Sequence, residues 1–136
     1  MATASGYFTI ERSITGLSPR EMASVLGMPD ARMMAGARVL LLRRQPLVGE
    51  FVYAASTKRP DGEGLVNVSL RSNFPIPHAW LGQRLIKVAP LVSHAEGLTY
   101  PKAASPVEQW RLVVPIEVEE LCTLRADQRY WPPRRH

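Results

Sequence analysis

The most constraining feature of this sequence is a segment near the C-terminus in which apolar side chains recur at every second position. From Trp110 to Val118, alternate residues are apolar. Successive side chains of a β-strand point to opposite faces, so the pattern is typical of a strand that buries one face. Pro115 interrupts the run, and since proline cannot donate a hydrogen bond to a neighbouring strand, we expect an edge strand or a bulge there. The segment predicts a fold built around a sheet.

Further segments have the composition of strands and are separated by turn residues. They are rich in leucine, β-branched and aromatic residues, and Pro60 to Gly64 supplies turn residues between two of them. We expect residues 37–42, 50–57 and 65–70 to form a meander that begins with a hairpin between the first two. The other expected strands are residues 84–92 and 109–118, with 7–10 and 121–124 as shorter candidates.

The strongest signal for a helix begins at Ser18. Its hydroxyl can accept a hydrogen bond from the amide of Glu21 while the Glu21 carboxylate reaches back, and Pro19 stands at the first helical position, where a missing N–H costs nothing. We therefore expect a helix from Ser18 to Gly27, where glycine favours a helix end. A second short helical stretch is expected over residues 31–35.

These segments together predict an α+β fold. The expected architecture is a mainly antiparallel sheet or small barrel of four to six strands with short N-terminal helices, and the sequence leaves open which of the two forms the sheet takes. The 136 residues, of which 46% are hydrophobic and 21% charged, match the size and composition of one folded domain. We therefore expect a single domain over residues 1–136.

Several kinds of site are disfavoured by residue counts and spacing. Cys122 is the only cysteine, and His78, His94 and His136 lie far apart, so neither an internal disulfide nor a metal site is expected. The longest apolar run, Val39 to Leu42, is too short to span a bilayer. No nucleotide fingerprint is found, and we expect a cytoplasmic protein without a cofactor and without membrane insertion.

Basic residues outnumber acidic ones and give a net charge of +5. Arginine grips phosphate with a planar fork of donors, so the excess indicates an anionic partner. In the expected meander, Arg43, Arg44 and Arg71 share one rim and form a candidate phosphate clamp, while Lys58 and Arg59 lie at the opposite end. The alternative is that all five are solvated charges at strand ends.

His94 is the candidate for acid–base chemistry. It follows an expected strand and begins a loop rich in proline and small residues, with Lys87 earlier in that strand. A ribonuclease needs a group with a pKa near neutrality to take the 2′-hydroxyl proton and cations to hold the phosphate. We therefore assign His94 and Lys87 as candidate catalytic residues. The alternative is a surface or capping histidine, since no second histidine or carboxylate stands beside it in sequence.

The C-terminal residues 130–136 are expected to contact a partner. Two prolines restrict the backbone, Tyr130 and Trp131 offer large amphipathic surfaces, and Arg134 and Arg135 add two cations. These residues could grip nucleic acid or an acidic protein neighbour. The alternative is that Trp131 folds back onto the core of its own chain.

Two functional hypotheses follow. The first is a small basic domain that binds RNA or another polyanion. The order of a short helical N-terminus followed by an antiparallel sheet, with basic charge, is similar to small ribonuclease toxin domains, and this resemblance implies nuclease activity. The second hypothesis is a non-catalytic structural or adaptor subunit of a larger protein assembly, with a protein partner or a homo-oligomer. Whether the chain is an enzyme is left open.

Overall fold

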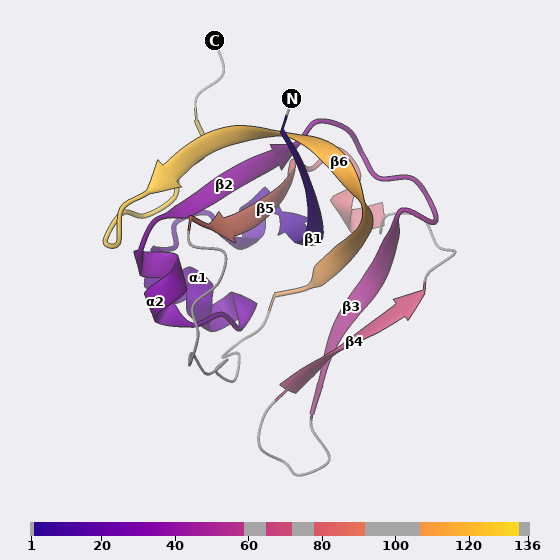
Figure 1. Ribbon diagram of the computed structural model, residues 1–136, viewed down its shortest axis with the longest axis horizontal. Coiled ribbons are helices and arrows are strands. Elements are labelled where there is room, and N and C mark those ends of the chain that lie inside the picture. Colours follow the sequence, from indigo (N-terminus) through magenta and orange to yellow (C-terminus); the bar gives the residue numbers. More distant parts are fainter. Residues whose placement is uncertain (1, 59–64, 72–77, 92–106, 134–136) are drawn as a thin grey trace.

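The computed structural model describes residues 2–58, 65–71, 78–91 and 107–133 (Figure 1). Among these residues, no helix has the length and apolar character needed to cross a membrane. The predicted α+β fold with a mainly antiparallel sheet is confirmed. The strands are β1 (Thr3–Ile10), β2 (Ala37–Leu42), β3 (Phe51–Lys58), β4 (Leu65–Arg71), β5 (Leu85–Pro90) and β6 (Gln109–Leu124), and the helices are α1 (Pro19–Leu26) and α2 (Asp30–Met34), with single 3-10 turns at Glu11–Ser13 and His78–Trp80.

The sheet closes on itself through part of its strands. The strand order is β1-β5-β2-β6-β3-β4, and an additional pairing joins β1 to β6. Strands β1, β5, β2 and β6 therefore form a four-stranded antiparallel barrel, which is the closed form of the two that the sequence left open. The β3–β4 hairpin continues the sheet from β6 and extends away from the barrel (Figure 1).

Strand β6 organises the barrel because it is sixteen residues long and has a partner on each edge. Its first half pairs with β1 on one edge and with β3 on the other, whereas its second half pairs with β2. Strands β2 and β3 consequently follow one another along the same edge of β6. The expected hairpin between 37–42 and 50–57 is therefore wrong, while the hairpin of β3 with β4 is confirmed.

The expected irregularity at Pro115 is confirmed as a bulge. Ala4 pairs with Ile116 and Gly6 pairs with Leu112, so β6 has extra residues around the proline in its pairing with β1. Because the proline lies within this bulge, the missing N–H leaves no gap in a regular ladder. Strand β6 can therefore occupy the interior of the sheet.

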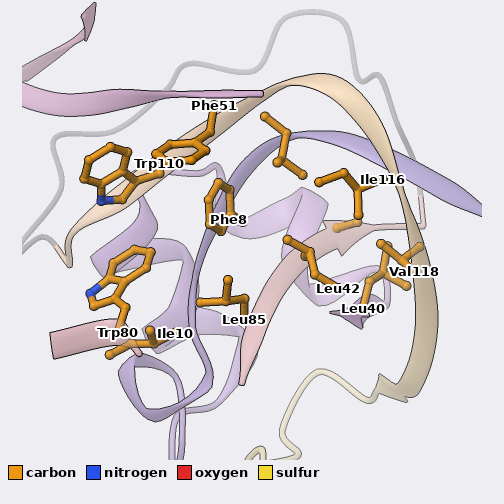
Figure 2. Packing of buried hydrophobic residues seen from close by; sticks show 12 residues of the cluster. Phe8, Ile10, Leu40, Leu42, Phe51, Trp80, Leu85, Trp110, Ile116 and Val118 are labelled. Atoms are coloured by element: carbon orange, nitrogen blue, oxygen red, sulfur yellow. The ribbon is translucent and has the colours of Figure 1, made fainter. Parts of the chain in front are cut away.

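Two hydrophobic clusters lie on the two faces of the sheet. The first fills the barrel, where aromatic rings meet edge to face (Figure 2). Phe51 contacts Trp110 with ring centroids 5.2 Å apart, and Phe8 contacts Trp80 at 6.0 Å. The second cluster packs the helices against the outside of the barrel. Its buried members are Ile14, Met22, Ala23, Met33, Ala37, Val39, Ile86, Leu124 and Tyr130.

The start of α1 has the predicted geometry. The Glu21 amide donates to the Ser18 hydroxyl over 3.3 Å, and the Ser18 amide donates to the Glu21 carboxylate over 3.1 Å. Gly27 ends the helix in the left-handed region with φ of 71°, a conformation that glycine adopts without strain. The capped helix holds residues 26–28 beside the barrel, where they become part of the site described next.

Candidate functional site

A pocket opens where β1 and β5 separate. The two strands pair only at Thr9–Ile86 and Ile10–Leu85. Beyond these pairs, a pocket of about 400 Å³ is lined by residues 7–9 of β1, residues 86–90 of β5, the end of α1 and Gln109. The mouth of a small barrel is a common position for a ligand site, and this volume lies in the range of small-molecule pockets.

The walls of this pocket carry three cationic side chains from three elements. They are Arg32 of α2, Arg38 of β2 and Lys87 of β5, and they define what we call the basic pocket. No aspartate or glutamate stands among its described lining residues. The Nε atom of Arg38 is buried and makes no hydrogen bond within the described part of the chain. Arg38 thus has an unused donor beside the pocket.

Lys87 reaches the basic pocket from the barrel side of β5. Leu85 and Ala89, which share its side of the strand by alternation, both belong to the barrel core. The Lys87 Nζ donates a long hydrogen bond of 3.5 Å to the backbone oxygen of Tyr7. A Cβ atom added at Gly6 would lie 3.1 Å from Nζ, so the glycine leaves room for the ammonium group. Burial lowers the pKa of Lys87 because a desolvated ammonium is less stable than a hydrated one.

The two candidate catalytic residues have different outcomes. Lys87 lies in the basic pocket, half-buried and next to Arg38 on the neighbouring strand. His94 lies outside the described residues, so its pairing with Lys87 stays a prediction.

A second hollow, of about 480 Å³, also gathers three arginines. Arg43, Arg44 and Arg84 line it together with Glu119, and we call it the arginine hollow. Arg43 lies 3.8 Å from the Glu117 carboxylate. Each of the other two arginines is likewise bonded to a carboxylate. Their ion pairs are Arg44–Glu50 at 2.7 Å and Arg84–Glu11 at 3.4 Å.

The strongest of these ion pairs joins Arg44 to Glu50. Arg44 Nη1 and Nη2 donate to the two oxygens of Glu50 over 2.7 and 2.9 Å, a bidentate arrangement. The Leu47 amide adds a third bond of 2.7 Å. These bonds, chiefly those from Arg44, lower the pKa of Glu50 to about 2. Two of the arginines expected to clamp phosphate, Arg43 and Arg44, thus form ion pairs with glutamates, and their role in binding phosphate stays a prediction.

The other basic residues of the expected clamp are only partly described. At the backbone level, Arg71 pairs with Val52 near the start of β3, and Lys58 pairs with Leu65 at its far end. Arg71 and Lys58 therefore lie at opposite ends of the hairpin, as the sequence indicated. Their side chains, and the whole of Arg59, Arg134 and Arg135, lie outside what the structure describes. Their role in binding stays a prediction.

Tyr130 packs inside its own chain. Its side chain is fully buried, and its hydroxyl donates a hydrogen bond to the carboxylate of Glu11, which also pairs with Arg84. Burial and the Glu11 carboxylate raise the pKa of Tyr130. The expectation that Tyr130 anchors an external partner is corrected, because the ring completes the cluster under the helices. Trp131 is 66% exposed and lies over Gly16, so its expected contact role stays a prediction.

Cys122 lies half-buried beside the same cluster. Burial raises the pKa of its thiol, and the charges of Glu120 and Glu11 raise it further. The reactive thiolate is therefore disfavoured. In the described ranges, no group of three or more histidine, cysteine, aspartate or glutamate side chains is placed to hold a metal ion.

Sequence reasoning missed Arg32 and Arg38 as site residues. Arg38 is the one charged residue of the otherwise apolar strand β2, and this signal could have identified it. Arg32 carries no comparable signal, because a charged residue on a short helix is ordinary. Comparisons with protein-family models, with curated proteins and with solved structures found no match.

Proposed function

We propose that this protein binds RNA or another polyanion by seating a phosphate group in the basic pocket. The observation that supports this proposal is the convergence of Arg32, Arg38 and Lys87 on one pocket whose described lining has no carboxylate. In the arginine hollow, by contrast, each arginine has a glutamate partner. Arg38, whose Nε makes no hydrogen bond to described residues, and Lys87, with one long hydrogen bond, are the cations that support the proposal most directly.

The chemistry of the pocket suits a phosphate diester. Arg38 offers a planar set of donors, including an Nε that makes no hydrogen bond to described residues, and Lys87 offers a point charge. Phosphate oxygens accept such bonds without needing a proton, and a charged hydrogen bond in a half-buried site contributes more than one in open water. The amide of Gln109 supplies a neutral polar group at the pocket wall.

The test compares two arginines that differ in their carboxylate partners. Affinity for a single-stranded oligoribonucleotide is measured by fluorescence anisotropy over a range of salt concentrations. Arg38→Gln is expected to weaken binding by about tenfold or more, because a charged hydrogen bond contributes roughly 1.5–3 kcal/mol. It should also reduce the slope of log affinity against log salt by about 0.7, the value for one phosphate of a single strand.

Arg43→Gln is the matched control, because it removes the same charge from a side chain already paired with Glu117 and Glu119. It should change both affinity and slope much less than Arg38→Gln. Equal losses in the two variants would contradict a specific seat and indicate binding by net charge alone. Inspection of the same RNA on a gel tests the predicted ribonuclease activity.

One observation favours the adaptor hypothesis as a second candidate. Strand β4 pairs only with β3 among the described strands, so one of its edges is open there. Proline and charged residues usually protect such an edge from pairing with another chain. Residues 65–70 contain neither. Antiparallel pairing of β4 with β4 of a second copy would give a two-fold dimer. Light scattering on protein purified at high salt distinguishes the hypotheses: bound nucleic acid favours the first, and an oligomer free of it favours the second.

A further inference from the structure

Lys87 differs in kind from the other two cations of the basic pocket. A guanidinium group stays protonated in proteins, whereas a lysine amine becomes a nucleophile once it loses its proton. The surroundings of Lys87 favour that loss. By alternation it shares one side of β5 with Leu85 and Ala89 of the barrel core. The only described hydrogen bond of its Nζ is the long one to the Tyr7 oxygen.

The pocket around Lys87 is also lined by two arginines. Arg38 of β2 and Arg32 of α2 line the same pocket, and Tyr7 of β1 lines the opposite wall. No carboxylate stands among the described lining residues to stabilise a protonated amine. Burial lowers the pKa of Lys87, because a desolvated ammonium is less stable than a hydrated one. Similar surroundings activate lysines that attack carbonyl groups.

The register of β2 and β5 places Arg38 and Lys87 on the same face of the sheet. Arg38 pairs with Ala89, and Leu40 pairs with Lys87. Paired residues point to the same face, so Arg38 and Lys87 are diagonal neighbours on one face of the sheet. The backbone positions of such diagonal neighbours lie roughly 7–8 Å apart. A ligand with a phosphate and a carbonyl a few bonds apart could reach both groups at once.

We infer that Lys87 is a nucleophilic amine that forms an imine with the carbonyl carbon of a phosphate-bearing aldehyde or ketone seated in the basic pocket. The amine nitrogen forms a bond to the carbonyl carbon, and the carbonyl oxygen leaves with the two amine protons as water. The step needs no oxidant or reductant. The phosphate part of the inference rests on the proposed function, and the amine part stands on the surroundings of Lys87.

The experiment traps the imine with a matched pair of probes. The full-length protein is treated with pyridoxal 5′-phosphate or with pyridoxal, which lacks the phosphate, and borohydride then reduces any imine to a stable secondary amine. Peptide mass spectrometry measures labelling at the three lysines of the chain, Lys58, Lys87 and Lys102. Free Nα-acetyl-lysine serves as the reference amine.

We expect both probes to label Lys87 severalfold faster than Lys58, Lys102 or the reference amine. The phosphate-bearing probe should in addition label Lys87 severalfold faster than pyridoxal does. Arg38→Gln should remove that preference for the phosphate. Lys87→Arg should remove the fast-labelled peptide, and unfolding in urea should make the three lysines equivalent.

The outcomes separate this inference from the proposed function. If pyridoxal labels Lys87 no faster than the reference amine, the nucleophile is overturned, even where Arg38→Gln weakens RNA binding. If both probes label Lys87 rapidly and equally, the nucleophile is supported, while the phosphate seat and the proposed function that depends on it are overturned.

Discussion

The basic pocket and the arginine hollow each contain three cations, yet only the hollow has a carboxylate among its described lining residues. Every arginine of the hollow forms an ion pair with a glutamate, and two of these carboxylates, Glu50 and Glu117, come from segments that the fold places beside the hollow. The described walls of the pocket carry no acid at all. From this comparison we expect a cluster of basic residues to bind an anion only where the fold leaves carboxylates out of reach. Counting arginines in the sequence cannot detect that difference.

The hollow also contains two kinds of ion pair. Arg43 and its glutamates are about half exposed, and exposed pairs of this kind contribute little to stability. The Glu11 side chain is only 10% exposed, and its carboxylate accepts the Tyr130 hydroxyl as well as pairing with Arg84. The first kind neutralises charge, whereas the second also fixes the C-terminal segment to the barrel.

The largest expected effect is therefore at Glu11. Glu11→Gln keeps the shape of the side chain but leaves Arg84, a largely buried cation, without its counter-charge. We expect the free energy of unfolding to fall by about 2–3 kcal/mol, since an unpaired buried charge is costly. Urea unfolding followed by tryptophan fluorescence measures the change.

Arg43→Gln is the control for this prediction as well, and its effect should stay within roughly 0.5 kcal/mol. The double variant Glu11→Gln with Arg84→Gln should recover part of the loss, because it removes the stranded charge. A loss at Glu11 no larger than that at Arg43 would show that the two kinds of pair are equivalent.

Local chemistry made several elements predictable. The capping pair of Ser18 and Glu21 defines the start of α1, and alternation defines β6, because both signals depend on residues adjacent in sequence. The pairing of both β2 and β3 with β6 was missed, since partner choice among strands is decided by contacts distant in sequence. The same reason applies to the candidate site. Lys87 could be singled out from the sequence, but the pocket that it lines together with Arg32 depends on the tertiary fold.

Substitution of Lys87 is expected to change the free energy of unfolding less than substitution of Glu11, and to raise it where the Glu11 variant lowers it. Lys87→Met replaces a desolvated ammonium by an apolar side chain of similar length, so it removes the cost of burying charge. We expect a gain of about 1 kcal/mol, or roughly 3–5 °C in melting temperature, together with weaker RNA binding. Scanning calorimetry and anisotropy measure the two changes.

The pH dependence gives a second check on Lys87. A lysine whose pKa is lowered in the folded state destabilises the protein at pH values below that lowered pKa. The penalty disappears as the pH rises from there toward the ordinary pKa near 10.4. The advantage of Lys87→Met should therefore shrink in alkaline buffer. Arg12→Met, which removes an exposed cation, should show neither the gain nor its loss with pH.

The smallest expected effect is a change in RNA affinity when one arginine of the hollow loses its glutamate partner. Glu50→Gln releases Arg44 from its bidentate partner, so RNA affinity at low salt should rise and the salt slope should steepen, by less than about one unit. Glu120→Gln makes the same change in net charge at a carboxylate bonded to Thr123. If both variants gain RNA affinity equally, net charge determines binding and the release of Arg44 does not.

Lowering the pH should protonate Glu50, and so reproduce the effect of Glu50→Gln on Arg44, only far below neutrality. The pKa of Glu50 is about 2, below the ordinary value near 4.3, so its stabilising contribution is present above that ordinary value. The contribution is lost only as the pH falls through about 2. Between pH 7 and 5 Arg44 therefore stays neutralised. A titration of the Glu50 carboxyl carbon by NMR with a midpoint near 4.3 would show that the pair is open in solution, and the contrast between hollow and pocket would then disappear.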